Sequence, residues 1–208
     1  MTNEADRVLA QLNVSRETSE RLKVLADLLA KWNPRINLVS KASLGDLWTR
    51  HILDSAQVFQ MASHPVKHWV DIGSGGGFPG LVVAIMAPEQ NSPMAVTLIE
   101  SDQRKCAFLR TVLRETGVEG MVLAKRIEQT EHQNADILSA RALSDLSSLL
   151  SFADHHLATN GTALLPKGVT WQKEVEMARE SWSFDLDVIT SKTEPSSVIL
   201  KVKDIRRV

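Results

Sequence analysis

The sequence predicts an α/β protein whose doubly wound, mostly parallel sheet is covered by helices on both faces. From His68 onward, short apolar runs alternate with segments of helical periodicity, which is the pattern of strand and helix units. A glycine-rich turn between Gly73 and Gly80 joins the first apolar run to the next helical segment. The chain before this first apolar run contains helical periodicity only. We therefore expect an N-terminal helical extension over residues 1–62, packed on one compact unit over residues 63–208.

Composition and length are those of an ordinary globular protein. The chain has 208 residues, of which 43% are hydrophobic and 24% charged, enough to bury roughly 70% of the unfolded surface. The lone Cys106 excludes an internal disulfide and fits a reducing compartment. No basic-then-apolar leader follows Met1, and the longest apolar run, Leu81 to Ala87, is far short of the ~20 residues of a membrane helix. We expect a cytoplasmic protein with no membrane partner.

The charge balance gives no general sign of nucleic-acid binding. Lysine and arginine number 24 against 25 aspartate and glutamate residues, for a formal net charge of −1. Proteins that bind naked duplex usually carry a basic surplus. An RNA substrate would therefore require a local basic patch, or an RNA already held by other proteins.

The N-terminal extension is predicted to contain two helices. Residues 1–33 have leucines at helical spacing, with Ser15 as a plausible N-cap, and Asn33-Pro34 is expected to end this helix before a loop over residues 33–40. A capping-box-like pair, Ser43 and Asp46, is expected to start the second helix. His51 follows Trp48 by one helical turn, and this spacing predicts a buried histidine.

The remaining elements follow in strict alternation. The first predicted strand ends at Asp71, and the next four cover 95–100, 121–124, 135–139 and 161–165. The predicted helices cover 79–87, 103–115, 143–157 and 169–181. Two paired strands, 184–190 and 198–202, complete the chain. In open sheets of this kind, ligands bind outside the carboxyl ends of the strands. The candidate site is therefore the set of residues at these ends: Asp71, Glu100, Ile127, Glu128, Arg141 and Lys167.

The glycine-rich turn is compatible with two kinds of ligand. Gly75-x-Gly77-x-x-Gly80 satisfies a dinucleotide fingerprint, and Glu100 lies about 20 residues on, where a ribose-binding acid is expected. A carboxylate at Asp71 would face the phosphates of a dinucleotide, whereas it suits the ammonium group of a methionine moiety. The pattern Asp-x-Gly-x-Gly-x-Gly resembles motif I of the Rossmann-like class I S-adenosylmethionine (SAM) methyltransferases. A nucleotide-dependent oxidoreductase, and a turn that binds nothing, are the alternatives.

Motifs that this sequence lacks narrow the choice of methyl acceptor. The segment Ser139 to Ala142 stands where amine methyltransferases usually carry an Asn/Asp-Pro-Pro-aromatic motif, and Cys106 lies within a predicted helix. A nucleophile with its own lone pair, such as guanine N7, requires alignment rather than a general base. Three roles stay open for Arg141: a hydrogen bond to guanine O6, ordering of the cofactor carboxylate, or an ion pair with Asp145.

Five segments together resemble the RsmG (GidB) family of bacterial 16S rRNA guanine-N7 methyltransferases: Trp32 to Val39, Arg50 to Ser55, Asp71 to Gly80, Arg141-Ala142 and Lys167-Gly168. The resemblance implies SAM-dependent methylation of one guanine in the 530 loop of 16S rRNA, position 527 in the usual rRNA numbering. It also implies cofactor contacts at Gly73, Phe78, Ile127, Glu128 and Arg141, to which the glycine-rich turn and the strand ends add Asp71, Gly75 and Glu100. Arg35, Arg50, His51 and Lys167 are the candidate RNA contacts, and Arg141 is a positioning residue.

The same resemblance sets the expected partners. These are 16S rRNA, the small ribosomal subunit or its assembly intermediate, bound by a monomer that carries no metal. The alternative is a non-catalytic ribosome-binding or assembly protein that keeps the SAM-binding fold.

Overall fold

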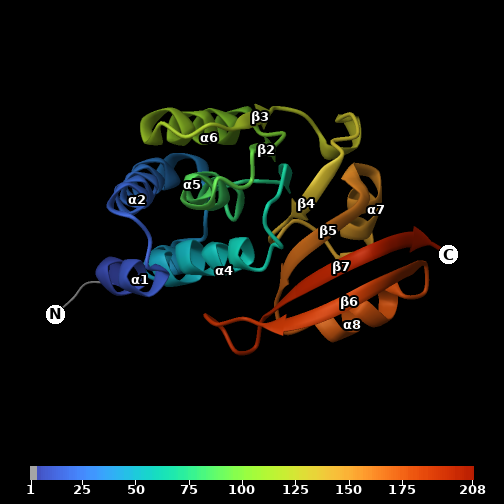
Figure 1. The fold of residues 1–208 in the computed structure, drawn as a ribbon. Helices are drawn as coiled ribbons and strands as arrows, with labels where there is room; N and C mark the ends of the chain where they lie inside the picture. The colour runs from blue at the N-terminus through green and yellow to red at the C-terminus, as the bar shows by residue number, and fades with distance from the viewer. Residues whose placement is uncertain (1–3) are drawn as a thin grey trace.

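Seven strands form one sheet in the order β3-β2-β1-β4-β5-β7-β6 (Figure 1). This is a computed structural model, and it describes residues 4–208. Strands β1 to β5 are parallel to one another, and β7 is antiparallel to both β5 and β6. The strands are β1 (His68–Ile72), β2 (Ala95–Ile99), β3 (Met121–Leu123), β4 (Ala135–Ser139), β5 (Leu157–Lys167), β6 (Trp182–Thr190) and β7 (Val198–Arg207). The predicted α/β class with a mostly parallel sheet is confirmed.

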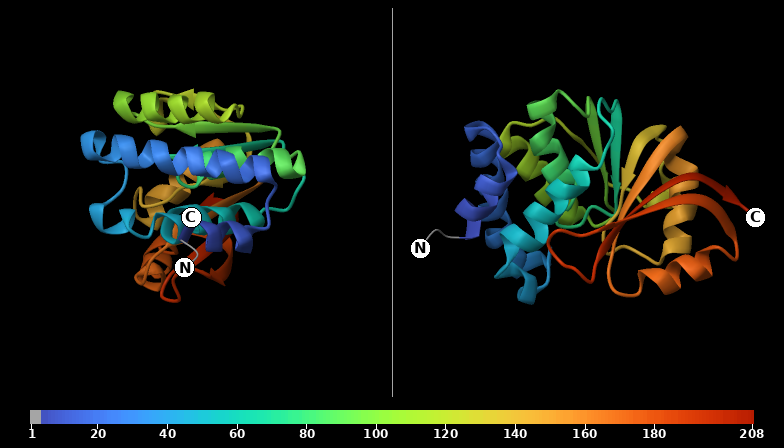
Figure 2. Two further views of the ribbon diagram at one scale, coloured as in Figure 1. Left: turned by 90° about the vertical axis from the view of Figure 1, so that its left-hand side faces the viewer. Right: turned by 60° about the horizontal axis from the view of Figure 1, so that its bottom comes forward.

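Helices cover both faces of this sheet (Figure 2). The first part of the chain forms α1 (Glu4–Leu12), α2 (Arg16–Ile36), α3 (Lys41–Leu44), the π-helix η1 (Trp48–Leu53) and α4 (Asp54–Gln60). The later helices are α5 (Gly80–Gln90), α6 (Gln103–Thr116), the short η2 (Ile127–Gln129), α7 (Leu146–His156) and α8 (Trp171–Ala178). Within residues 4–208, no helix combines the length and apolarity that crossing a membrane requires.

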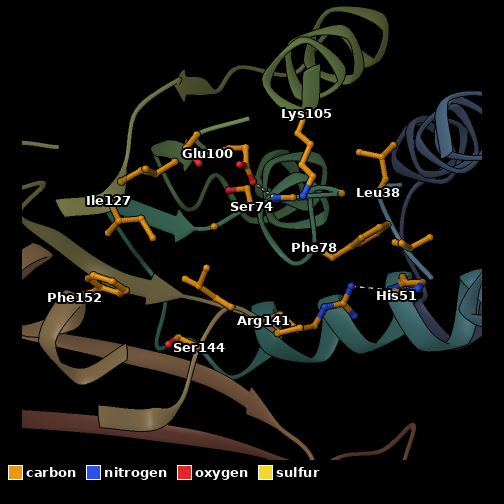
Figure 3. A pocket seen from close by; sticks show the side chains of 18 of the residues that line it. Leu38, His51, Ser74, Phe78, Glu100, Lys105, Ile127, Arg141, Ser144 and Phe152 are labelled. Carbon is orange, nitrogen blue, oxygen red and sulfur yellow. Dashed lines mark hydrogen bonds between the residues drawn. The ribbon is translucent and has the colours of Figure 1, made fainter. Parts of the chain in front are cut away.

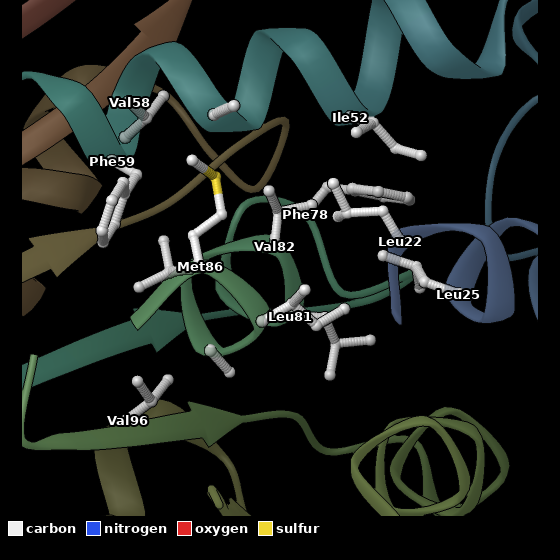
Figure 4. Close-up of a cluster of buried hydrophobic side chains, with 14 of the residues drawn as sticks. Leu22, Leu25, Ile52, Val58, Phe59, Phe78, Leu81, Val82, Met86 and Val96 are labelled. Atoms are coloured by element: carbon white, nitrogen blue, oxygen red, sulfur yellow. The ribbon is translucent and has the colours of Figure 1, made fainter. Parts of the chain in front are cut away.

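Two apolar cores lie on opposite faces of the sheet. Successive residues of β1 alternate between them, with Trp69 in one core and Val70 in the other. The first core joins α2, α4 and α5, where Leu22, Phe59 and Leu81 are fully buried (Figure 4). A central parallel strand buried on both faces is mostly apolar, and the run of Trp69, Val70 and Ile72 is why β1 is recognisable in the sequence.

The first predicted helix differs from the structure at two points. Asn13, at φ 50°, separates α1 from α2, and the predicted N-cap Ser15 accepts a hydrogen bond from the Thr18 N–H. The predicted stop at Asn33-Pro34 is wrong, because α2 continues through Pro34 to Ile36 and ends at Asn37 in the left-handed region. The Asn33 side-chain oxygen accepts from the N–H groups of Leu38 and Val39, at 2.8 and 2.9 Å. Asn33 thus fixes the chain reversal that follows the helix.

The second helix begins earlier than predicted and is not uniform. Ser40, rather than Ser43, is the N-cap, because its hydroxyl accepts from the Ser43 N–H. Asp46 accepts from the Arg50 N–H through its backbone carbonyl at 2.8 Å, at the entrance to η1. A π-helical turn, with i→i+5 hydrogen bonds, contains more residues than an α-helical turn and is frequent at functional sites.

Several later boundaries also differ. Asp145 caps α7, which therefore begins at Leu146 and not at 143. Strand β7 continues to Arg207 because it pairs with β6 over its whole length, from Thr190↔Val198 to Trp182↔Arg207. The terminal β-hairpin is consequently much longer than the sequence indicated.

Candidate functional site

A cavity of about 790 Å³ opens at the carboxyl ends of the parallel strands (Figure 3). Its walls come from the glycine-rich turn after β1, the ends of β2, β3 and β4, and the segment between α2 and α4 of the N-terminal extension. The predicted site residues that line it are Gly73, Gly75, Phe78, Glu100, Ile127, Glu128, Arg141, Arg50 and His51. Asp71, Arg35 and Lys167 do not line it.

Glu100 connects the end of β2 to the glycine-rich turn. Its Oε2 accepts from the Gly75 N–H at 2.9 Å, and its Oε1 accepts from the Asp102 N–H at 2.8 Å. Each carboxylate oxygen can accept a further hydrogen bond. Gly73 adopts φ +62°, and an added Cβ there would lie 2.5 Å from Leu143. The turn is therefore held against Glu100 and needs a glycine at its first position.

The direct cofactor contact expected for Asp71 is not supported by its position. Asp71 is fully buried, and its Oδ1 accepts from the Ser139 hydroxyl at 2.6 Å. Ser139 in turn accepts from the Trp69 indole N–H at 2.9 Å. Asp71 Oδ2 has no hydrogen-bond partner within the described part of the chain, and it lies 2.7 Å from where a Cβ on Gly80 would be. Burial raises the pKa of Asp71 to about 6, opposed by the hydrogen bond from Ser139.

The N-terminus of α5, to which the glycine-rich turn leads, does not line this cavity. Gly80, the first residue of α5, packs against Leu98 and Asp71 rather than lining the cavity. The next backbone N–H, that of Leu81, is already bonded to the Gly77 carbonyl at 2.7 Å. The glycine-rich turn itself, and not the helix end, borders the ligand space.

Arg141 lies at the end of β4 and connects that strand to η1 and α4. Its Nη2 donates to His51 Nδ1 at 2.7 Å, and its Nη1 donates to the Arg50 carbonyl at 3.0 Å. The guanidinium also lies 5.1 Å from the centre of the Phe78 ring and 3.5 Å from Asp54 Oδ2. The ion pair with Asp145 considered from the sequence is absent, because Asp145 caps α7 and Arg141 pairs with Asp54 instead.

His51 is buried, as its spacing predicts, and it also borders the cavity. Its side chain is buried, with 8% of the residue exposed, and its ring stacks on Phe78 with 5.0 Å between centres at the cavity wall. Burial, reinforced by the positive charges of Arg141 and Arg50, lowers the pKa of His51 to about 3. The imidazole is therefore neutral at physiological pH.

Two candidate RNA contacts lie elsewhere. Lys167 is engaged by Glu174 at 2.7 Å and by the Ser144 carbonyl at 2.8 Å, because the end of β5 packs beside the start of α8. Arg35 is exposed near the end of α2, outside the lining of the cavity. Lys167 instead lines a smaller neighbouring cavity, and the role in RNA binding that the family resemblance implies for both residues stays a prediction.

Other lining residues were not expected as ligand contacts. Leu38 and Val39 form an apolar edge, and Phe152 of α7 lies near Ile127 (Figure 3). Lys105, Lys125 and Arg126 also line the cavity, although the sequence favoured a solvated face for Lys125 and Arg126. The polar run after β3 was a usable signal, whereas nothing in the helical pattern of 143–157 distinguished Phe152.

The comparisons with known proteins agree with this geometry. Residues 18–199 match the family model GidB, described as rRNA small subunit methyltransferase G. A protein of Ruegeria sp. named "Ribosomal RNA small subunit methyltransferase G" is 59% identical over 198 residues, covering 95% of this chain and 96% of that protein. A Cereibacter sphaeroides protein of the same name is 48% identical over 203 residues, covering 98% of each.

Solved structures share the fold at low identity. The ribosomal protein L11 methylase of Lactobacillus delbrueckii has a TM-score of 0.58 at 13% identity, covering 73% of this chain and 76% of that chain. The M. jannaschii TYW2 protein, solved in complex with AdoMet, has a TM-score of 0.56 at 13% identity, covering 84% and 80%. These likenesses show a class I SAM-methyltransferase fold. Together with the match over 18–199 and the relatives of nearly equal length, they show that the chain belongs to the rRNA small subunit methyltransferase G (GidB) family.

Proposed function

We propose that this protein is a SAM-dependent methyltransferase that methylates N7 of one guanine in the 530 loop of 16S rRNA. The observation that carries the proposal is the 59% identity, over nearly the whole of both chains, to a protein named as a small subunit rRNA methyltransferase. The non-catalytic assembly protein and the oxidoreductase find no comparable support.

The cavity residues fit the proposed cofactor. Glu100 keeps acceptor capacity for ribose hydroxyls, Ile127 and Phe152 offer apolar surface to an adenine ring with Glu128 at its edge, and the turn from Gly73 to Gly75 allows close backbone approach. When bound, SAM supplies a methyl group on a positively charged sulfur. Phe78 and Arg141 form the wall next to the reacting end. In this proposal, Asp71 supports the turn from beneath and does not touch the cofactor.

The lining residues suit a reaction without a general base. His51 Nδ1 already accepts a hydrogen bond from Arg141, and Asp71 lies outside the cavity. Guanine N7 carries a lone pair that can attack directly, so the protein contributes alignment and charge placement. Arg141 is the positioning residue of this reaction.

Basic side chains that line the larger cavity form a local basic patch, which the near-neutral net charge of the whole chain does not reveal. Its lining contains Arg50, Lys105, Lys125, Arg126 and Arg141, against Glu100 and Glu128. Basic side chains around the opening neutralise RNA phosphates. We propose that the protein acts as a cytoplasmic monomer on 16S rRNA or an assembling small subunit, with residues 1–62 as an extension of the catalytic unit 63–208.

The decisive experiment is an rRNA modification map of a strain that lacks this protein. Loss of N7-methylguanine from the 530 loop, restored by the wild-type gene, is the expected result; a persistent modification would refute the assignment. A single-turnover assay with labelled SAM and small subunits separates the enzyme from a binding module, because the module binds both and transfers nothing.

A further inference from the structure

A second, smaller cavity adjoins the first. It has a volume of about 390 Å³, within the range of small-molecule sites. Arg50, Arg141, Ala142 and Ser144 line both cavities and form their common wall. The opposite wall of the smaller cavity comes from the end of β5 and from the turn between β6 and β7. The two spaces therefore meet at Arg141.

Asp54 presents one carboxylate oxygen to this smaller cavity. Its Oδ1 is held by the Gln57 side-chain amide at 2.6 Å and by the Thr193 hydroxyl at 2.8 Å. Among residues 4–208, its Oδ2 has only the 3.5 Å contact with Arg141 Nη1, which is at the long limit of a hydrogen bond. The side chain is about one-fifth exposed. Asp54 Oδ2 is thus a fixed acceptor with spare capacity, next to the guanidinium donors of Arg141.

The edge of guanine is complementary to this pair. Guanine carries O6 and N7 side by side as acceptors, and N1–H and the 2-amino group as donors on the other side of O6. An arginine and a carboxylate placed next to each other match O6 and these donors. Adenine has an amino donor where guanine has O6, so it would meet Arg141 donor to donor. Enzymes that modify a base commonly take it out of the stack and read its Watson–Crick edge in a pocket.

We propose that the smaller cavity receives the target guanine and that Asp54 is the residue that selects it; this inference rests on the proposed function. Asp54 Oδ2 accepts from N1–H and the 2-amino group, and Arg141 donates to O6. Since N7 neighbours O6, an O6 at the common wall directs N7 toward the larger cavity. The N7 lone pair then forms the bond to the methyl carbon as the carbon–sulfur bond breaks, leaving neutral S-adenosylhomocysteine and a positively charged guanine.

The test combines a change in Asp54 with a change in the base. Asp54→Asn keeps the size of the side chain and an oxygen for Gln57 and Thr193, but allows an amide donor in place of the Oδ2 acceptor. The RNA is a fragment spanning the methylated position, with guanosine or inosine there; inosine lacks only the 2-amino group. We expect inosine to lower kcat/KM of the wild type by about 10-fold, and Asp54→Asn to lower it about 10- to 100-fold on guanosine RNA. The variant should no longer distinguish the two RNAs.

Gln57→Leu is the matched control, because it removes the support of Oδ1 and leaves Oδ2 in place. It should retain the inosine penalty, whatever its overall activity. If Asp54→Asn also retains that penalty, or is as active as the wild type, Asp54 does not read the base. SAM affinity and melting temperature are measured for every variant, and Asp54→Asn should keep its SAM Kd within about twofold of the wild type. A wild-type protein that binds SAM but methylates neither the fragment nor small subunits from a strain that lacks the protein would instead refute the proposed function.

Discussion

Arg141 donates to His51 Nδ1 across 2.7 Å, which leaves Nε2 as the only nitrogen that can carry the proton of the neutral ring. Nε2 is buried and has no hydrogen-bond partner among residues 4–208. One contact between the end of β4 and the π-helical turn thus fixes both the tautomer and the orientation of the ring.

Acid should destabilise the protein through His51. Its pKa, about 3 when folded, lies below the ordinary value of 6.5. The stabilisation is therefore complete above pH 6.5 and is lost as pH falls toward 3. Relative to His51→Gln, the wild type should lose about 2 kcal/mol of unfolding free energy between pH 7.5 and pH 5. Urea unfolding of both proteins at the two pH values measures this, and parallel curves would contradict it.

Asp71 should have the opposite dependence. Its pKa is raised from 3.8 to about 6, so its contribution is fully present below pH 3.8 and is lost as pH rises through 6. Relative to Asp71→Asn, the wild type should gain about 1 kcal/mol between pH 7.5 and pH 5. The same unfolding measurements apply. A wild type that gains nothing over the variant would mean that the carboxyl is solvated.

Arg141→Ala should reduce methylation more than it reduces stability. Truncation leaves His51 and Asp54 without their shared donor and costs about 1–3 kcal/mol of folding free energy, while it removes the positioning group from the site. We expect methylation to fall by at least about 100-fold in protein that remains folded. Arg179→Ala is the control, because Arg179 also stacks on an aromatic ring, that of Phe184, outside both cavities. Equal losses of activity in the two variants would make Arg141 merely structural.

Glu100→Gln should weaken SAM binding by about 10- to 100-fold in isothermal titration calorimetry. The amide retains one acceptor for Gly75 or Asp102, and loses the charge that strengthens bonds to hydroxyl groups. Glu128→Gln provides the comparison, since Glu128 is exposed at the neighbouring strand end and should change affinity by less than about 3-fold. The reverse ranking would assign the ribose contact to Glu128.

Gly80→Ala should destabilise the protein by about 1–3 kcal/mol, because the new Cβ would lie 2.3 Å from Leu98 and 2.7 Å from Asp71. Gly45→Ala is the matched substitution. No atom of the described residues lies within 4 Å of its added Cβ, and its φ of −66° suits alanine. It should be neutral or stabilising by about 0.4–1 kcal/mol in thermal or urea unfolding. A neutral Gly80→Ala would mean that the turn can move away from Asp71.

The sequence was informative where local pattern and burial coincide. Strand β4 has its predicted bounds, and α6 ends before Gly117, which adopts φ +63°. The sequence did not predict the π-helical turn, because over so short a segment the spacing of apolar residues on one face is nearly the same in an α-helix and a π-helix. The helix stop predicted at Asn33-Pro34 was wrong because local pattern does not indicate where the chain reverses. The hydrogen bonds between the Asn33 side chain and residues 38 and 39 form only once the chain has turned.

The site was predictable as a set of strand ends but not as a set of contacts. Which way Asp71 points depends on Ser139 and Gly80, residues from two other elements. The partner of Arg141 is Asp54, 87 positions away, where the sequence offered Asp145, four residues further along the chain. Tertiary packing determines these side-chain orientations and partners, and residue spacing along one helix or strand does not indicate them.

The bond from Gln57 to Ser191 spans 134 positions of the chain. Translation makes the five parallel strands long before the final hairpin, so an emerging polypeptide can assemble the nucleoside-facing half of the enzyme while Asp54 still lacks Thr193. The support of the Asp54 carboxylate is therefore completed by one of the last segments of the chain to be made, the turn between β6 and β7.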